Sequence, residues 1–186
     1  MLVNNAAMDQ EPASVVDIDP DIWEQILRTN VTGPMLLMKG VIPHMIRAGG
    51  GSIINIASLA GIRSIPNMPA YSTSKGALVA LTQQAALDFG RLKIRCNVIC
   101  PGGVRTEMTD WAMGFFTEKL KTNLDGVLSY FSKDVPLHRL AVPREIAGIC
   151  SYLASEDASF MTGAVLPVDG GAAIVDVSGA AISSIG

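Results

Sequence analysis

Apolar residues in this chain fall into short unbroken runs and into longer segments with helical spacing. The short runs predict buried strands that lack a polar face, at 52–57, 94–100 and 164–168 and at the first residues up to Val3. Apolar positions three and four apart predict helices over 20–46, 70–89 and 143–154. Strands that alternate with helices indicate a parallel sheet with right-handed crossovers. The pattern therefore predicts an α/β fold of the doubly wound type.

Proline and glycine mark the expected boundaries of these elements. Asp19-Pro20 predicts an N-cap followed by proline at the first helical position. Gly33-Pro34 predicts a kink in the first long helix, and Gly90 should follow the end of the second. Residues 105–140 mix aromatic and charged residues, which predicts a cover segment. The last strand closes near residue 171, so we expect one domain over 1–171 and a disordered tail over 172–186.

Composition narrows the function classes. The 186 residues are enough for one well-buried domain, and 49% are hydrophobic against 17% charged. A net charge of −3 provides no basic surface, so nucleic acid is not an expected partner. No apolar run approaches the ~18 residues of a membrane span, and no signal-peptide pattern opens the chain. We expect a soluble, cytoplasmic protein that does not bind membranes.

Cysteine and histidine give no sign of a metal site. Cys96, Cys100 and Cys150 lack CxxC spacing, and His44 and His138 are isolated from one another. Cys96 and Cys100 should point to one side of a strand. We expect buried free thiols and no metal.

Candidate chemistry centres on Ser58, Tyr71 and Lys75. Tyr71 and Lys75 are four residues apart, so they lie on one face of the predicted helix, and Ser58 follows the strand before it. An ammonium beside the phenol should lower a tyrosine pKa that is otherwise about 10, which would give a proton donor and acceptor near neutral pH. Two of these residues also have a structural interpretation: Ser58 as a turn cap and Tyr71 as a half-buried aromatic.

The order of the motifs resembles the short-chain dehydrogenase/reductase family. The resemblance runs from Leu2 to Gly171 and rests on these pieces: Asn4-Asn5-Ala6-Ala7, Asn30 within Thr-Asn-Val-Thr-Gly, Ser58, Tyr71-x-x-x-Lys75, Pro101-Gly102-Gly103-Val104-Arg105-Thr106, Thr162-Gly163-Ala164 and Val168-Asp169-Gly170-Gly171. It implies a Rossmann-like sheet and hydride transfer between a nicotinamide, NAD or NADP, and a carbonyl or secondary alcohol.

The resemblance also implies a role for each site residue. Tyr71 would be the general acid or base, and Ser58 would bind the substrate oxygen. Lys75 would tune the phenol and hold the ribose, while Asn30, at an irregularity in its helix, would position a water that relays protons. The residues expected to line the cofactor cleft are Asn5, Ala6, Tyr71, Lys75, Val104 and Thr106.

Partners are expected on two grounds. Small and apolar residues on the two long helices predict self-association as a homo-oligomer, and the family pairs such helices. Trp111, Met113, Phe115 and Phe116 in the cover segment predict an apolar pocket for a small alcohol or ketone.

Two departures from the family are visible. Ala7 stands where the family has glycine, which is a mild change. The larger one is the glycine-rich phosphate turn: the cluster Gly49-Gly50-Gly51 precedes a strand, whereas a phosphate turn must follow a strand and open a helix. By the family's layout, about 80 to 90 residues with three strands would precede Met1, including the residues that distinguish NAD from NADP.

Three interpretations therefore stay open. The first is the catalytic part of an oxidoreductase. The second is a non-catalytic, truncated relative that acts as an oligomerisation or interaction module. The third is an unstable fragment without function.

Overall fold

The computed structural model describes residues 1–176 and contains one parallel sheet in this range. Its strands stand in chain order: β1 (Leu2–Asn4), β2 (Gly51–Ile56), β3 (Ile94–Pro101) and β4 (Val165–Val168). Val3 pairs with Ile54, and Ile54 pairs with Asn97, so the carboxyl ends of β1, β2 and β3 lie at one end of the sheet. The prediction of an α/β fold with a parallel sheet is confirmed.

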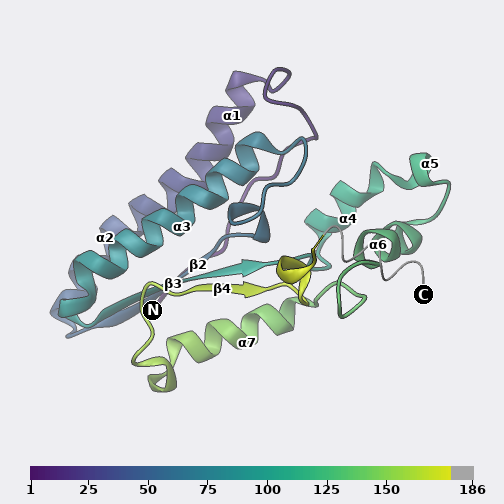
Figure 1. Ribbon diagram of the computed structural model, residues 1–186. Coiled ribbons are helices and arrows are strands. Elements are labelled where there is room, and N and C mark those ends of the chain that lie inside the picture. The colour runs from purple at the N-terminus through teal and green to yellow at the C-terminus, as the bar shows by residue number, and fades with distance from the viewer. Residues whose placement is uncertain (177–186) are drawn as a thin grey trace.

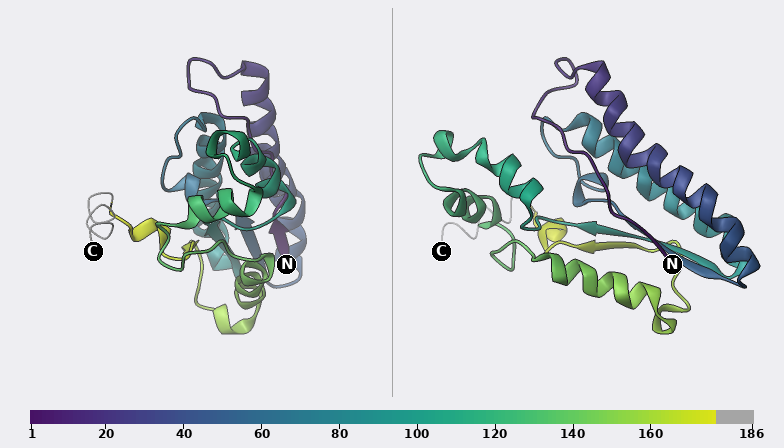
Figure 2. Two further views of the ribbon diagram at one scale, coloured as in Figure 1. Left: turned by 90° about the vertical axis from the view of Figure 1, so that its right-hand side faces the viewer. Right: turned by 180° about the vertical axis from the view of Figure 1, so that it is seen from behind.

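Helices cover both faces of this sheet (Figures 1 and 2). One face carries α1 (Pro20–Leu27), α2 (Gly33–Arg47) and α3 (Pro69–Phe89), and the other carries α7 (Pro143–Ala154). A cover of three helices lies beyond the carboxyl end of β3, as Figure 1 shows: α4 (Glu107–Gly114), α5 (Thr117–Leu120) and α6 (Leu124–Ser132). The cover segment expected over residues 105–140 is therefore helical.

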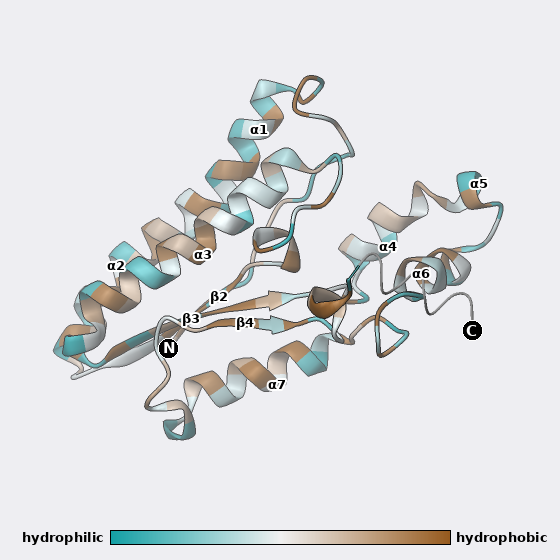
Figure 3. Cartoon of the chain, viewed as in Figure 1, coloured by the Kyte–Doolittle hydropathy of each residue, from teal (hydrophilic) through white to brown (hydrophobic). Residues whose placement is uncertain are grey.

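The central strands β2 and β3 are mostly hydrophobic because both of their faces are buried. Ile53 packs among α2 and α3, whereas its neighbour Ile54 packs against α7, and neither side chain is exposed. Burial of one such side chain contributes about 1.5–3 kcal/mol, and successive strand residues point to opposite faces. Figure 3 shows the hydrophobic colouring of the strands between the two helical layers. Cys96 and Cys100 are buried on the same face, as the period of two predicted.

The last crossover differs in hand from the first two. The chain moves across the sheet in one direction, from β1 to β4, and passes over the α2–α3 face for the first two connections. The third connection continues in the same direction but passes through α7 on the opposite face. Because the direction is kept and the face changes, the hand must reverse. The expectation that every crossover is right-handed is wrong for this connection.

The first long helix contains a π-helical turn, η1 (Arg28–Thr32), instead of the expected kink at Gly33-Pro34. Pro34 has no amide hydrogen and its ring crowds the carbonyl of Asn30, four residues earlier. The chain widens by one residue, so that the Gly33 amide donates to the Arg28 carbonyl. The helix then continues through α2.

Other predicted boundaries have mixed outcomes. Asp19 is an N-cap, since its carboxylate accepts from the Asp21 amide at 2.7 Å, and Pro20 opens α1 as predicted. Gly90 follows α3 but stays right-handed, at φ −57°, and the left-handed residue is Lys93. The expected disordered tail begins with a short 3₁₀ turn, η5 (Ala172–Ile174), while residues 177–186 lie outside the described part.

Candidate active site

A cleft of about 640 Å³ opens at the carboxyl ends of β1, β2 and β3. Polar residues from three loops and α3 converge there, while α7 and the cover contribute apolar residues. The lining includes Asn5, Ala7, Ser58, Tyr71, Lys75, Val104, Thr106, Met108, Ile146 and Cys150. Segments that are far apart in sequence thus share one cavity, as expected for this end of a parallel α/β sheet.

Ser58 follows β2 and opens the 3₁₀ turn η2 (Leu59–Gly61). Its hydroxyl accepts a hydrogen bond from the Ala60 amide at 3.1 Å, so it does cap the turn. The same hydroxyl lies beside the phenol of Tyr71 and lowers that pKa, against the larger effect of burial. Ser58 therefore caps the turn and also lies beside the Tyr71 phenol, so its structural and chemical interpretations are both compatible with the structure.

Tyr71 and Lys75 lie one turn apart on α3, as predicted. The Lys75 ammonium is 5.6 Å from the centre of the Tyr71 ring and donates to the Ile56 carbonyl at 3.0 Å. Lys75 is almost fully buried, with 2% of its surface exposed. The helix thus places a cation against the tyrosine ring, and the end of β2 holds that cation in place.

The pKa values correct the expectation drawn from spacing alone. Burial raises the pKa of Tyr71 to about 12, with Ser58 lowering it and the charge of Asp9 raising it. Burial also lowers the pKa of Lys75 to about 8, against the raising effect of Asp9. The lysine was expected to lower the pKa of the phenol. Instead, desolvation is the largest effect on both groups, because each is enclosed by its neighbours.

Asn30 lies at the π-helical irregularity, buried away from the cleft. Its amide group accepts from the Met8 amide at 2.7 Å and donates to the Met8 carbonyl at 2.9 Å. It also donates to the Ser74 hydroxyl at 3.0 Å. The Asn30 side chain thus ties the loop after β1 to α3, one residue before Lys75. With 1% of its surface exposed, Asn30 is not a solvent-facing helix residue.

Sequence analysis missed two residues of the loop after β1. The side chain of Gln10 accepts from the Tyr71 amide at 3.0 Å and so caps the first turn of α3, whose own N-cap residue Met68 makes no such bond. Asp9 is held between Gln10 and the anchored Met8, and burial raises its pKa. No local motif marks either residue, because their partners lie about 60 positions away.

Not all of the residues expected to hold a cofactor line the cleft. Asn5, Val104 and Thr106 line the cleft, whereas Ala6 is exposed and is not part of its lining. Thr106 caps α4 by accepting from the Thr109 amide at 3.2 Å. The cofactor role of each residue stays a prediction, and Ala6 has the weakest geometric support.

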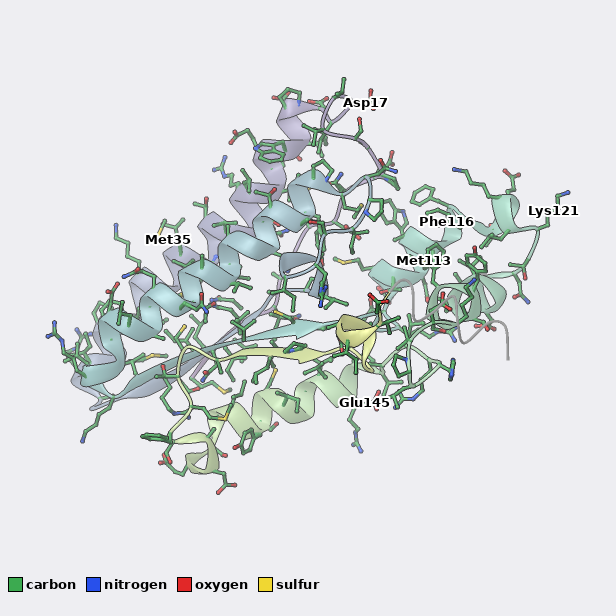
Figure 4. The ribbon with its side chains drawn as sticks, in the orientation of Figure 1. Asp17, Met35, Met113, Phe116, Lys121 and Glu145 are labelled. Carbon is green, nitrogen blue, oxygen red and sulfur yellow. The ribbon has the colours of Figure 1, made fainter. Side chains whose placement is uncertain are left out.

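The aromatic residues of the cover do not gather around one pocket. Trp111 and Phe115 stack edge to face and are half exposed, and Phe116 packs on Phe131 instead. Met113 lines a second cavity of about 370 Å³ between the cover and the end of β4. Figure 4 labels Met113 and Phe116 in this cover, and Glu145 at the start of α7. Of the four residues expected to form an apolar pocket, only Met113 lines either of these two cavities.

The remaining expectations concern what is absent from residues 1–176. Within this range no cluster of three potential metal ligands occurs, and no helix is both long and apolar enough to cross a membrane. Cys96 and Cys100 are buried free thiols, and Cys150 is half-buried in the cleft lining. Gly49 and Gly50 form the turn before β2 and Gly51 is the first residue of that strand, so the three glycines lie at the opposite end of β2 from Ser58. The cluster is a loop, as its position in the sequence indicated.

Comparison with known proteins agrees with this geometry. A family model described as enoyl-(acyl carrier protein) reductase matches residues 1–173. Dehydrogenase/reductase SDR family member 4 of Sus scrofa is 34% identical, over 93% of this chain and 59% of its own length. The 2-(R)-hydroxypropyl-CoM dehydrogenase of Xanthobacter autotrophicus is 37% identical, over 91% of this chain and 65% of its own length.

Solved structures show the same similarity. The ligand-free aldohexose dehydrogenase of Thermoplasma acidophilum superimposes with a TM-score of 0.88 at 34% identity, covering 95% of this chain and 68% of that one. NAD⁺-bound xylitol dehydrogenase gives a TM-score of 0.82 at 37% identity, covering 91% and 67%. This chain spans about three fifths of the length of the curated relatives that it matches. The family match over nearly all of its residues shows that the chain belongs to the short-chain dehydrogenase/reductase family.

Proposed function

We propose that this chain carries the catalytic part of an NAD(P)-dependent oxidoreductase that interconverts a secondary alcohol and a carbonyl compound. The observation that supports it most is the convergence of Ser58, Tyr71 and Lys75 on one cleft at the carboxyl end of the sheet. A hydroxyl, a phenol and an ammonium around one cavity can bind a carbonyl oxygen and exchange a proton with it.

In this proposal the raised pKa of Tyr71 suits the direction of carbonyl reduction. With a pKa of about 12 the phenol is protonated at neutral pH and can donate to the developing alkoxide. Ser58, beside the phenol, holds the same oxygen. For alcohol oxidation the phenol must lose its proton, and the Lys75 ammonium stabilises that state because its pKa of about 8 keeps it mostly charged at pH 7.

The cofactor of the proposed enzyme is NAD or NADP, whose nicotinamide ring takes up or releases the hydride. The residues in the cleft fit its nicotinamide and ribose half. The Lys75 ammonium has three donors and one recorded acceptor, the Ile56 carbonyl, so donors remain for ribose hydroxyls. Asn5, Val104 and Thr106 stand around it. Among solved relatives, 4-hydroxyisoleucine dehydrogenase carries NADH and ElxO carries NADP.

Asn30 in this proposal acts through its backbone. Both of its side-chain N–H donors already serve Met8 and Ser74, and its side-chain oxygen accepts from the Met8 amide, so no side-chain donor is left for a water. Its carbonyl lacks the usual helical donor, because position 34 is proline. We therefore assign the water of the proton relay to the Asn30 carbonyl.

The proposed substrate is a small alcohol or ketone with apolar substituents. Relatives include a trans-4-hydroxycyclohexanecarboxylate dehydrogenase and a levodione reductase, whose names describe such hydroxyl and ketone groups. In this chain Met108 lines the cleft, and Met113 and Phe131 line the adjoining cavity. Cytoplasmic location remains a prediction.

We also propose that the chain associates with a second copy of itself. The same surface would serve the alternative function of a non-catalytic interaction module. Met35, Leu36 and Leu37 on α2 are exposed, at 38%, 55% and 54% of their surface, and Figure 4 labels Met35. Three consecutive exposed apolar residues are unusual for a helix facing water. A second copy of the chain, packed through α2 and α3, would cover them.

The enzymatic proposal is tested by NAD(P)-linked oxidation of secondary alcohols. The chain is assayed alone and mixed with the N-terminal nucleotide-binding segment of a related enzyme, and Tyr71→Phe is compared with wild type. We expect kcat to fall by about three orders of magnitude or more with little change in cofactor affinity, because the ring remains and the proton donor is lost. The exposed Tyr152→Phe is the matched control. Near-normal kcat in Tyr71→Phe would remove this residue from the proton-transfer role, and no turnover in any preparation would favour the interaction module.

A further inference from the structure

The turn that carries Ser58 is short and internally bonded. The Ser58 hydroxyl accepts from the Ala60 amide at 3.1 Å, and the Gly61 amide donates to the Ser58 carbonyl at 2.9 Å. Both bonds join the first and last parts of the same 3₁₀ turn, η2. Ser58 and Gly61 therefore move together, and whatever places Gly61 also places the Ser58 hydroxyl.

Gly61 rests directly on the backbone of α3. A Cβ atom at this position would lie 2.7 Å from the carbonyl carbon of Lys75, 2.8 Å from its oxygen and 3.0 Å from the amide nitrogen of Gly76. These are backbone atoms in the middle of a helix, so they cannot rotate away as a side chain can. Gly61 is not among the residues with positive φ, so the reason for glycine here is contact and not backbone conformation.

The α3 residue at this contact, Gly76, also lacks a side chain. A Cβ atom on Gly76 would meet the Gly61 carbonyl oxygen at 3.4 Å, which is an ordinary contact distance. Two glycines thus face each other where the Ser58 turn meets the helix that carries Tyr71 and Lys75. The contact lies at Lys75 itself, one helical turn from the phenol.

We propose that Gly61 is a positioning residue that fixes the distance between Ser58 and the pair formed by Tyr71 and Lys75. This inference rests on the proposed oxidoreductase function. Gly61 touches no reacting atom and acts through Ser58. A side chain at position 61 pushes the turn away from α3, and Ser58 moves with it because the turn is bonded as a unit.

The size of the displacement follows from the contact distance. Moving a Cβ from 2.7 Å to an ordinary contact at 3.4 Å requires a shift of about 0.7 Å. A misplacement of about 1 Å in a catalytic geometry lowers the rate by about 100-fold. We therefore expect Gly61→Ala to lower kcat by about 10- to 100-fold. The KM for NAD(P) should stay within about twofold, because Lys75 and the cleft residues Asn5 and Thr106 remain.

The decisive experiment is a double-mutant cycle of Gly61→Ala with Ser58→Ala, measured as kcat and KM in the active preparation. If Gly61 acts through Ser58, Gly61→Ala lowers kcat less than threefold once the Ser58 hydroxyl is absent. A general structural defect would lower kcat by the same factor in both backgrounds, which would overturn the proposal, as would an unchanged kcat in the single variant. Gly148→Ala on α7 is the matched control, because a Cβ there meets nothing within 4 Å.

Two further measurements apply if Gly61→Ala does not fold or if the wild type has no activity. If Gly61→Ala does not fold, Gly76→Val adds two methyl groups beyond a Cβ that already meets the Gly61 carbonyl oxygen at 3.4 Å, so the turn must move. We then expect a fall in kcat of a few-fold that disappears in the Ser58→Ala background. Persistence of that fall, or its absence in both backgrounds, overturns the proposal. If wild type turns over no alcohol, the proposed function fails. A crystal structure of Gly61→Ala or Gly76→Val then tests the positioning itself, and an unmoved Ser58 relative to Tyr71 refutes it.

Discussion

Replacing Lys75 with methionine should stabilise the folded chain at neutral pH although it removes a residue of the proposed site. Lys75 is buried, and burial lowers its pKa from 10.5 to about 8. The folded state therefore destabilises the charged form of the amine relative to the neutral form, and the unfolded state does not. Methionine has a similar length without the charge, so it removes this destabilisation while filling the same space.

The magnitude follows from the two pKa values. At 1.36 kcal/mol for each pKa unit, the gap between 10.5 and about 8 means that the buried charge costs about 3 kcal/mol at pH 7. Methionine also loses the hydrogen bond from the ammonium to the Ile56 carbonyl, which is worth about 1.5–3 kcal/mol. We expect Lys75→Met to raise the free energy of unfolding by about 1 kcal/mol at pH 7.

The direction in which the free energy of unfolding changes with pH tests whether desolvation of Lys75 is the cause. Below pH 8 the amine is charged in both states, and its full cost is present. Between pH 8 and 10.5 the folded amine has lost its proton while the unfolded amine keeps it, so the free energy of unfolding of the wild type rises with pH. By pH 9.5 about 2 kcal/mol of the cost has gone. The difference in the free energy of unfolding between Lys75→Met and wild type should therefore fall by about 2 kcal/mol, so that the variant is the less stable protein at pH 9.5.

The assay is urea unfolding at pH 7 and pH 9.5, followed by circular dichroism. Both pH values lie below the range in which Tyr71, with its pKa of about 12, begins to lose its own proton. Lys39→Met, at an exposed lysine on α2, is the control and should show no comparable dependence on pH. A difference between Lys75→Met and wild type that is the same at both pH values would refute the desolvation argument.

Three other predictions follow from contacts in the same region. Asp9→Asn should lower the pKa of Lys75 further, because the Asp9 charge raises it, so the alkaline limb of a pH–rate profile should move to lower pH; an unmoved limb would place Asp9 outside the electrostatics of the site. Asn55→Ala should lower the free energy of unfolding by about 2–4 kcal/mol in a urea titration, because it leaves Asn4 and Thr82 without the partners that they have at 2.7 and 2.8 Å, and a loss below 1 kcal/mol would contradict this. Leu36→Glu should reduce the molecular mass measured by light scattering, since it charges the exposed face of α2, and a mass unchanged from an oligomeric wild type would exclude this face as the interface.

Much of the fold could be predicted because its signals are local. Continuous apolar runs identified β2 and β3 within a residue or two of their bounds, and Pro143 marked the start of α7. The same holds for Tyr71 and Lys75, whose common face follows from helical spacing alone. Period-two alternation also placed Cys96 and Cys100 on one face of β3.

Ser58 was brought into the site by a longer argument, namely the order of motifs along the chain. Its neighbour Gly61 carried no signal, since a glycine in a turn is ordinary and only the approach of α3 makes its missing side chain matter. Asp9 and Gln10 were missed for the same reason. Their partners on α3 become neighbours only when the loop after β1 folds over that helix.

The sequence by itself thus determined which segments form strands and helices and which functional groups those segments carry. It misjudged the electrostatics: spacing predicted that Lys75 lowers the pKa of Tyr71, whereas burial raises it to about 12. It also missed the reversed hand of the last crossover, because that depends on which face of the sheet α7 occupies. Spacing along a helix is a property of consecutive residues. Desolvation and handedness belong to the packed arrangement of distant segments, and only the tertiary structure decides them.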